Sequence, residues 1–149
     1  MAITYIGSTL KTGSGTLTEA TDGGFVVVSK TVTVTTTADG LAASATLTLP
    51  AYSQIIDFYV DKPVTQAVGG GTATTLPVTV GTAAAGTQYM ASTDMFSTAR
   101  AVPTLTVAQV LAMSDIGTNQ SVVVTVDPNG TVSTTQAVIR LTVNYAQKV

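Results

Sequence analysis

Hydrophobic and polar residues alternate along most of the chain, which is the pattern of β-strands with one buried face. In FVVVSKTVTVTTT, residues 25–37, the even-numbered valines point one way and the serine and threonines the other. SATLTLP, residues 44–50, repeats the alternation and predicts a strand that buries its alanine and leucines. ADG at 38–40 lies between the two stretches and is typical of a tight turn.

Lys30 interrupts the first of these strands, because it falls on the face that otherwise carries valine. Two explanations remain open. Either the register slips at a bulge near Ser29, or the lysine lies beyond the end of the area that the rest of the protein covers.

Residues 49–68, LPAYSQIIDFYVDKPVTQAV, predict a strand with an apolar inner face and a more polar outer face. The inner face consists of Ile56, Phe58 and Val60. The outer face consists of Ile55, Asp57, Tyr59 and Asp61. We expect Pro63 to end the strand, because proline has no N–H to donate to a neighbouring strand.

Two short strands follow in the middle of the chain. TTLPVTVG, residues 74–81, predicts a strand near the edge of a sheet, because Pro77 lies inside it. TQYMAS, residues 87–92, predicts a further short strand.

Two segments break the alternation and predict short helical turns. TDMFSTAR, residues 93–100, offers Thr93 as an N-cap. In TVAQVLAMSD, residues 106–115, Thr106 and Gln109 have the spacing of a capping box. Apolar residues recur at helical spacing in the second segment, at positions 107, 110 and 111.

The last element, residues 121–147, predicts two valine-rich strands joined as a hairpin around DPNG. The second strand alternates clearly, with an inner face of Ala137, Ile139, Leu141, Val143 and Tyr145. Seven or eight short strands with turns between them predict an all-β fold, an antiparallel β-sandwich or jelly roll with one or two short helical turns.

Residues 1–24 differ in composition from the rest, because glycine, serine and threonine dominate and large apolar side chains are few. Such a segment cannot pack a core of its own. The chain therefore divides into an N-terminal arm or loop at 1–24 and a β-sandwich domain at 25–149. We expect the arm to become ordered against a neighbouring subunit or a larger assembly.

Charged residues make up only 9% of the chain, and the formal net charge is -2. The six basic residues are dispersed, so we expect no binding to nucleic acid.

The N-terminus lacks the pattern of a secretory signal, and no run approaches the roughly 18 apolar residues of a transmembrane helix. No membrane partner is therefore expected. Threonine replaces much of the missing charge and gives a neutral surface that can contact protein without desolvating ions.

Catalytic chemistry has few candidates, because the chain has neither histidine nor cysteine. Asp57 and Asp61 lie about 13 Å apart on one strand, farther than the carboxylate pairs of glycosidases. We expect these aspartates to face solvent or an interface. No enzyme activity, cofactor or metal is therefore expected. The loop aspartates, which could serve calcium, are interpreted as turn residues; they are Asp22, Asp39, Asp115 and Asp127.

Three runs resemble the head-decoration, or cement, proteins of tailed bacteriophages. They are TLPAYSQIIDFYVDKPV, LPVTVGTAAAGTQYMASTD and the closing AQVLAMSDIGTNQSVVVTVDPNGTVSTTQAVIRLTVNYAQK, within residues 46–148. The resemblance implies a jelly-roll-like sandwich, a homotrimer, and addition in many copies to the outside of a capsid built from the major capsid protein. It also implies location in the virion after synthesis in the bacterial cytoplasm. It supplies no catalytic motif.

Two other functions remain open beside capsid decoration. One is a component of a phage tail, neck or fibre, and the other is a carbohydrate-binding or adhesin-like surface module. The residues predicted to contact a partner lie in the arm and on the outer strand face, and they are Lys11, Leu17, Glu19, Asp57, Tyr59 and Asp61.

Overall fold

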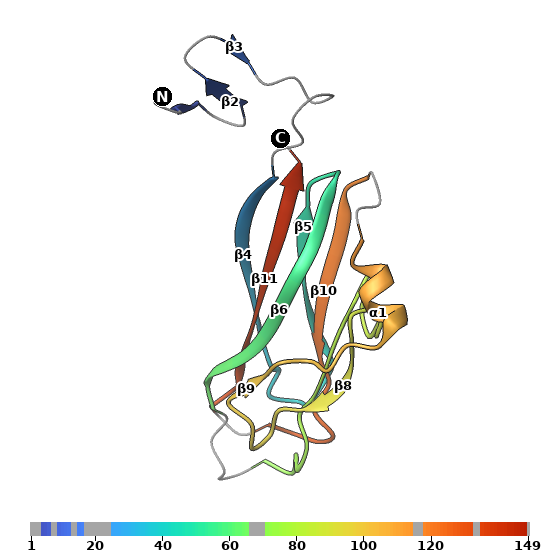
Figure 1. Cartoon of the computed structure of the whole chain (residues 1–149). Helices are drawn as coiled ribbons and strands as arrows, with labels where there is room; N and C mark the ends of the chain where they lie inside the picture. The colour runs from blue at the N-terminus through green and yellow to red at the C-terminus, as the bar shows by residue number, and fades with distance from the viewer. Residues whose placement is uncertain are drawn as a thin grey trace.

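Two four-stranded antiparallel sheets form the sandwich in the computed structural model (Figure 1). The first has the order β5 (Ala43–Leu49), β10 (Gln120–Val126), β7 (Pro77–Gly81) and β8 (Met90–Asp94). The second has the order β4 (Phe25–Thr35), β11 (Val138–Lys148), β6 (Ser53–Val64) and β9 (Arg100–Ala101). The structure describes residues 4–6, 9–12, 15–16, 25–65, 71–114, 118–132 and 135–148. The predicted all-β sandwich is confirmed.

Three short strands lie within the predicted arm, where the sequence suggested an arm or loop. They are β1 (Thr4–Ile6), β2 (Thr9–Thr12) and β3 (Gly15–Thr16), and they pair with one another in the order β1-β2-β3. The other residues of 1–24 lie outside the described part of the chain. The division into an arm and a sandwich domain therefore stays a prediction.

Strand β11 lies at the centre of the second sheet, because β4 pairs with one of its edges and β6 with the other. Its predicted inner face, from Ala137 to Tyr145, is confirmed, because each side chain on that face is at most 2% exposed.

The register between β4 and β11 is regular along its whole length, so the bulge suggested near Ser29 is absent. Lys30 instead reaches the other sheet, where its Nζ donates to the carbonyl oxygen of Thr48 at 3.1 Å. It is therefore half-buried at the margin of the core.

Strand β6 contains two irregularities that correct the predicted faces. Its pairing with β11 shifts by one residue between Ile55 and Asp57, so Ile55 is buried and Ile56 is 49% exposed. The prediction that Ile56 faces inward and Ile55 outward is wrong, because a bulge places two successive residues on the outer side. The second shift lies near Pro63, and the strand continues to Val64 instead of ending at the proline.

The predicted C-terminal hairpin is also wrong, since β10 and β11 belong to different sheets. The connection between them is held by the segment that precedes β7: the side-chain Oδ1 of Asn129 accepts from the N–H groups of Thr74 and Thr75 at 3.0 and 2.8 Å. DPNG therefore begins a crossover between the sheets. Pro77 opens β7, which lies between β10 and the edge strand β8 and so near the edge of the sheet, as predicted.

Of the two predicted helical turns, only the second exists. Residues 93–100 contain the end of β8, a loop at 95–99 and the start of β9. Oδ1 of Asp94 accepts from the N–H groups of Leu76 and Phe96 at 2.8 and 2.9 Å. Helix α1 (Val107–Ala112) begins at the predicted capping box. Among the described residues, no helix has the length and hydrophobicity of a transmembrane span.

Gly40 provides a test of the turn between β4 and β5. It has a φ of +76°, and a Cβ atom there would lie 2.2 Å from the carbonyl oxygen of Gly130. Gly40→Ala should therefore lower the free energy of unfolding by more than the about 1–2 kcal/mol that left-handed backbone alone costs a residue with a side chain. Urea denaturation measures the loss. The control Gly71→Ala changes an exposed glycine and should unfold like the parent. Equal behaviour of the two variants would contradict the described turn.

Candidate interaction surfaces

The outer face of β6 brings three of the predicted contact residues into one row. Asp57 pairs across to Asn144, Tyr59 to Thr142 and Asp61 to Arg140 on β11. The row is therefore a continuous part of the outer surface of the second sheet. Of the other predicted contact residues, Lys11 lies in β2, and Leu17 and Glu19 lie outside the described residues.

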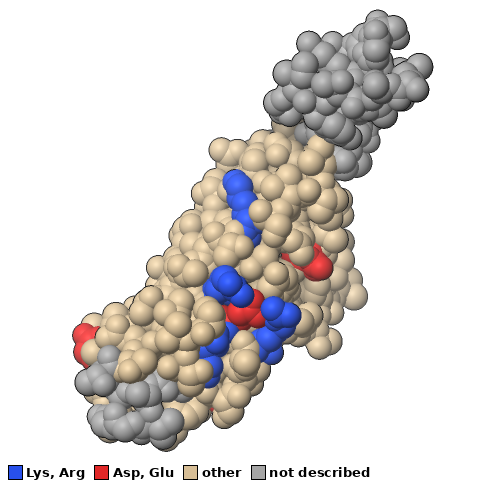
Figure 2. Space-filling view, turned by 90° about the vertical axis from the view of Figure 1, so that its left-hand side faces the viewer, with Lys and Arg blue, Asp and Glu red and all other residues tan. Residues whose placement is uncertain are grey.

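Asp61 lies between two arginines that come from the strands on either side of it. Arg100 on β9 and Arg140 on β11 are both its cross-strand partners. Arg100 Nε lies 2.6 Å from Oδ1, and Arg140 Nη2 lies 2.9 Å from Oδ2. Figure 2 shows acidic atoms enclosed by basic ones on this face. Direct cross-strand pairing is the position at which opposite charges in a sheet stabilise each other.

The prediction that Asp61 is simply an outward, solvated carboxylate is wrong, because the residue is only 5% exposed. Hydrogen bonding from Arg100 holds the pKa of Asp61 below its usual value, burial opposes this effect, and Arg140 reinforces it. Both carboxylate oxygens accept from guanidinium groups. An aspartate held ionised in this way is a poor proton donor.

Tyr59 and Asp57 complete the row with different partners. The guanidinium of Arg100 lies 4.8 Å from the centre of the Tyr59 ring, within the range of a cation–π contact. The Oδ1 atom of Asp57 accepts from Nδ2 of Asn144 at 2.6 Å, and Asp57 is exposed. No ion pair is found for Asp57 among the described residues. The two aspartates of the row therefore lie in unlike environments.

Sequence reasoning missed both arginines of this face. Arg140 gave a usable signal, since it falls on the outer side of the alternating pattern in β11. Arg100 gave none, because its segment was predicted to be helical and its pairing with β6 depends on the folded chain.

Of the loop aspartates, Asp39 has the side-chain contacts of a turn residue. Oδ1 of Asp39 accepts from the N–H of Leu41 at 3.4 Å, and a hydrogen bond from the Thr37 side chain lowers the pKa of Asp39. Asp22 and Asp115 lie outside the described residues. Within the described ranges, no three acidic side chains come together as metal ligands.

Helix α1 presents a second surface, the helix patch, which consists of Val107, Val110 and Leu111. These side chains are 78%, 54% and 68% exposed, and none of the residues of α1 is buried. The predicted apolar face of the helix therefore points away from the core. Three neighbouring apolar side chains at such exposure are typical of a surface that contacts another protein.

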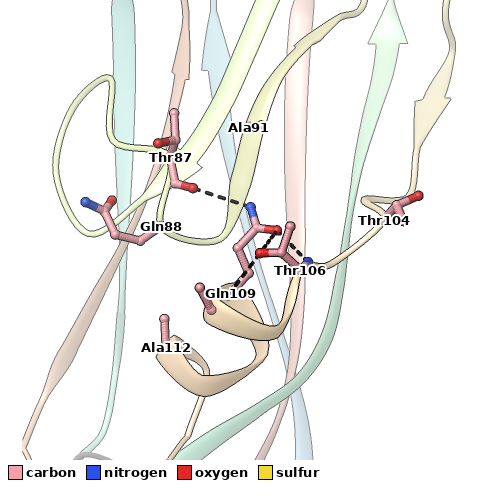
Figure 3. Close-up of a pocket in the computed structure, with 8 residues that line it drawn as sticks. Thr87, Gln88, Ala91, Thr104, Thr106, Gln109 and Ala112 are labelled. Atoms are coloured by element: carbon pink, nitrogen blue, oxygen red, sulfur yellow. Dashed lines mark hydrogen bonds between the residues drawn. The ribbon is translucent and has the colours of Figure 1, made fainter.

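Gln109 links helix α1 to the turn before β8. Its Oε1 accepts from the N–H of Thr106, and its Nε2 donates to the carbonyl oxygen of Thr87 at 3.5 Å (Figure 3). A shallow groove of about 480 Å³ separates α1 from the strand β8 and the turn before it. Its lining is neutral, and consists of Thr87, Gln88, Ala91, Thr104, Thr106, Ala108, Gln109 and Ala112. The groove offers hydrogen bonds and small apolar contacts.

Comparison with known proteins gives a likeness of fold. No family model matches the chain, and no curated protein matches its sequence significantly. Among solved structures, a chain from the capsid of Ralstonia phage GP4 is similar, with a TM-score of 0.53 and 18% sequence identity. The match covers 85% of this chain and 86% of that chain. The two chains therefore share the sandwich fold over most of their lengths.

Proposed function

We propose that this chain is a structural protein of a bacteriophage virion. The observation that carries the proposal is the shared fold with a chain of a phage capsid. Since the same aligned residues make up 85% of one chain and 86% of the other, the two chains are nearly equal in length. The likeness therefore extends over most of both chains, which supports a similar place in a virion.

Within the virion, we propose a decoration protein that binds the outer surface of the capsid, with the major capsid protein and further copies of itself as partners. The helix patch supports this role, because it is an apolar surface with no cover among the described residues. On a lattice, neighbouring copies raise the effective concentration, so weak single contacts suffice for high occupancy. A homotrimer, as the resemblance to decoration proteins implies, is part of the proposal. The role needs no catalytic group.

The helix patch is the proposed contact with the shell, and Leu111→Asp tests it. A carboxylate at the centre of an apolar contact must lose its hydration, so binding should weaken at least tenfold, equivalent to about 1.4 kcal/mol per contact. The measurement is co-sedimentation of the purified chain with expanded capsids that lack it. Leu41→Asp is the matched control, because Leu41 is 64% exposed but lies in the turn before β5.

Three results would contradict this scheme. Failure of the parent chain to co-sediment with capsids would overturn the decoration role. Binding at the portal vertex alone would favour a tail or neck component, and binding to a glycan array would favour a carbohydrate-binding module. Equal binding by the two leucine variants would leave the decoration role intact but reject the helix patch as its contact.

A further inference from the structure

The row on the outer face of β6 carries opposite charges at its two ends. At one end, Arg100 and Arg140 share the single carboxylate of Asp61, which leaves one positive charge in excess. At the other end, Asp57 is exposed and accepts a hydrogen bond from the neutral amide of Asn144. The two aspartates are four positions apart on a regular stretch of strand, so the ends lie about 13 Å apart.

The positive end has spare hydrogen-bond donors. Each guanidinium has five N–H groups, and the bonds to Asp61 use three of the ten. The Nε of Arg140 is buried, so six donors remain for a further partner. The side chains of Arg100 and Arg140 are 61% and 42% exposed. A second carboxylate can therefore bind there without displacing Asp61.

The row has the geometry of a self-complementary contact. Tyr59 lies midway between Asp57 and Asp61 on the same face. A twofold axis through Tyr59 would place Asp57 of one copy opposite the arginine pair of the other, and would do so twice. Sheets that pack face to face lie about 10 Å apart, a distance that an arginine and an aspartate can span together.

The neighbouring surface fits such a contact. Thr31 and Thr142 lie beside the row, and their hydroxyl oxygens are 3.3 Å apart. Both side chains are neutral, so they add no charge that must be desolvated. The bulge in β6 turns Ile56 outward next to Asp57, where it supplies apolar area at 49% exposure. The bulge thus gives one end of the row both an acidic and an apolar contact.

We propose that the outer face of β6 and β11 is a contact between two copies of this chain, held by Asp57 of each copy against the Arg100 and Arg140 pair of the other. The contact goes beyond the proposed capsid role, because it concerns the purified chain alone. A failure to bind capsids therefore leaves it unaffected. On a shell, it would join neighbouring copies across a twofold axis.

The test is the oligomeric state of the full chain, measured by sedimentation velocity over a range of concentrations at low salt. The parent should form dimers, or larger assemblies joined in pairs, and raising the salt should weaken them. Asp57→Lys replaces two attractions with two repulsions and should raise the dissociation constant about tenfold or more. Asp127→Lys makes the same charge change at an exposed position after β10 and should associate like the parent.

A mixing experiment makes the test specific to the pairing. Arg100→Glu should also weaken association, but an equimolar mixture of Asp57→Lys and Arg100→Glu should associate again. In the mixed pair, the lysine introduced in one copy faces the glutamate introduced in the other, while the unchanged Arg100 of the first copy faces the unchanged Asp57 of the second. Urea denaturation of each variant establishes that it is folded. A parent that stays monomeric, equal association of Asp57→Lys and Asp127→Lys, or association lost only in Leu111→Asp would overturn the proposal.

Discussion

Replacing Leu141 with alanine is expected to lower the free energy of unfolding by about 2–5 kcal/mol. Leu141 lies in the middle of β11, opposite Val32 on one side and Val60 on the other, and its side chain is fully buried. The loss has two parts: the leucine no longer leaves water on folding, and a cavity remains. The cavity cannot close easily, because hydrogen bonds to β4 and β6 hold the backbone of β11 on both edges.

Urea denaturation followed by circular dichroism measures this loss. The control is Val107→Ala on the helix patch, where the side chain is 78% exposed and the expected change is within about 0.5 kcal/mol. The contrast separates the two kinds of apolar residue in this chain: Leu141 stabilises the fold, whereas Val107 is available to a partner. If both variants unfold at the same urea concentration, β11 is not the centre of the core.

Alternation along single strands predicted most of the core. In β5 and β11 every residue expected to be buried is buried or half-buried, because a strand paired regularly along its length keeps strict two-residue periodicity. The capping box of α1 was equally readable, since all of its hydrogen bonds lie within four residues of sequence. Short-range patterns thus gave reliable predictions wherever the structure depends on neighbours in sequence.

Pairing between distant segments was the part that the pattern could not supply. The bulge at Ile56 depends on the register of β6 against β11. The two strands are far apart in sequence: Ile55 pairs with Tyr145, 90 residues later. The sheet to which β10 belongs likewise depends on β5 and β7, and not on the nearby turn. The same reason applies to the charged face: Asp61 was recognised, but its two arginines come from β9 and β11.

Exposure of the helix patch shows a further limit of pattern reading. Apolar residues at helical spacing ordinarily indicate a face that packs on the core. In α1 the same spacing marks the side that points outward, whereas Gln109 on the opposite side donates to the carbonyl oxygen of Thr87. An amphipathic pattern therefore identifies a face that needs a partner, but not whether that partner is the same chain.

Asp61→Asn is expected to give the second large effect, a loss of about 1.5–3 kcal/mol of unfolding free energy at neutral pH. Asparagine keeps the shape but removes the charge that both arginines share. The loss should fall below that of a fully buried ion pair, because Arg100 and Arg140 are 61% and 42% exposed and can regain hydration. Asp127→Asn, at an exposed position, is the control and should change stability by less than about 0.5 kcal/mol.

The effect of Asp61→Asn should depend on pH in a defined direction. Hydrogen bonding from Arg100 lowers the pKa of Asp61 in the folded chain below its ordinary value of 3.8. A carboxylate with a lowered pKa stabilises the fold fully above that ordinary value, and the stabilisation is lost as the pH falls through the folded-state pKa. The difference between parent and Asp61→Asn should therefore be largest near neutral pH and shrink below pH 3.8. Urea denaturation of both proteins across this range tests it, and a difference that stays constant or grows in acid would show that the Asp61 charge does not stabilise the sheet.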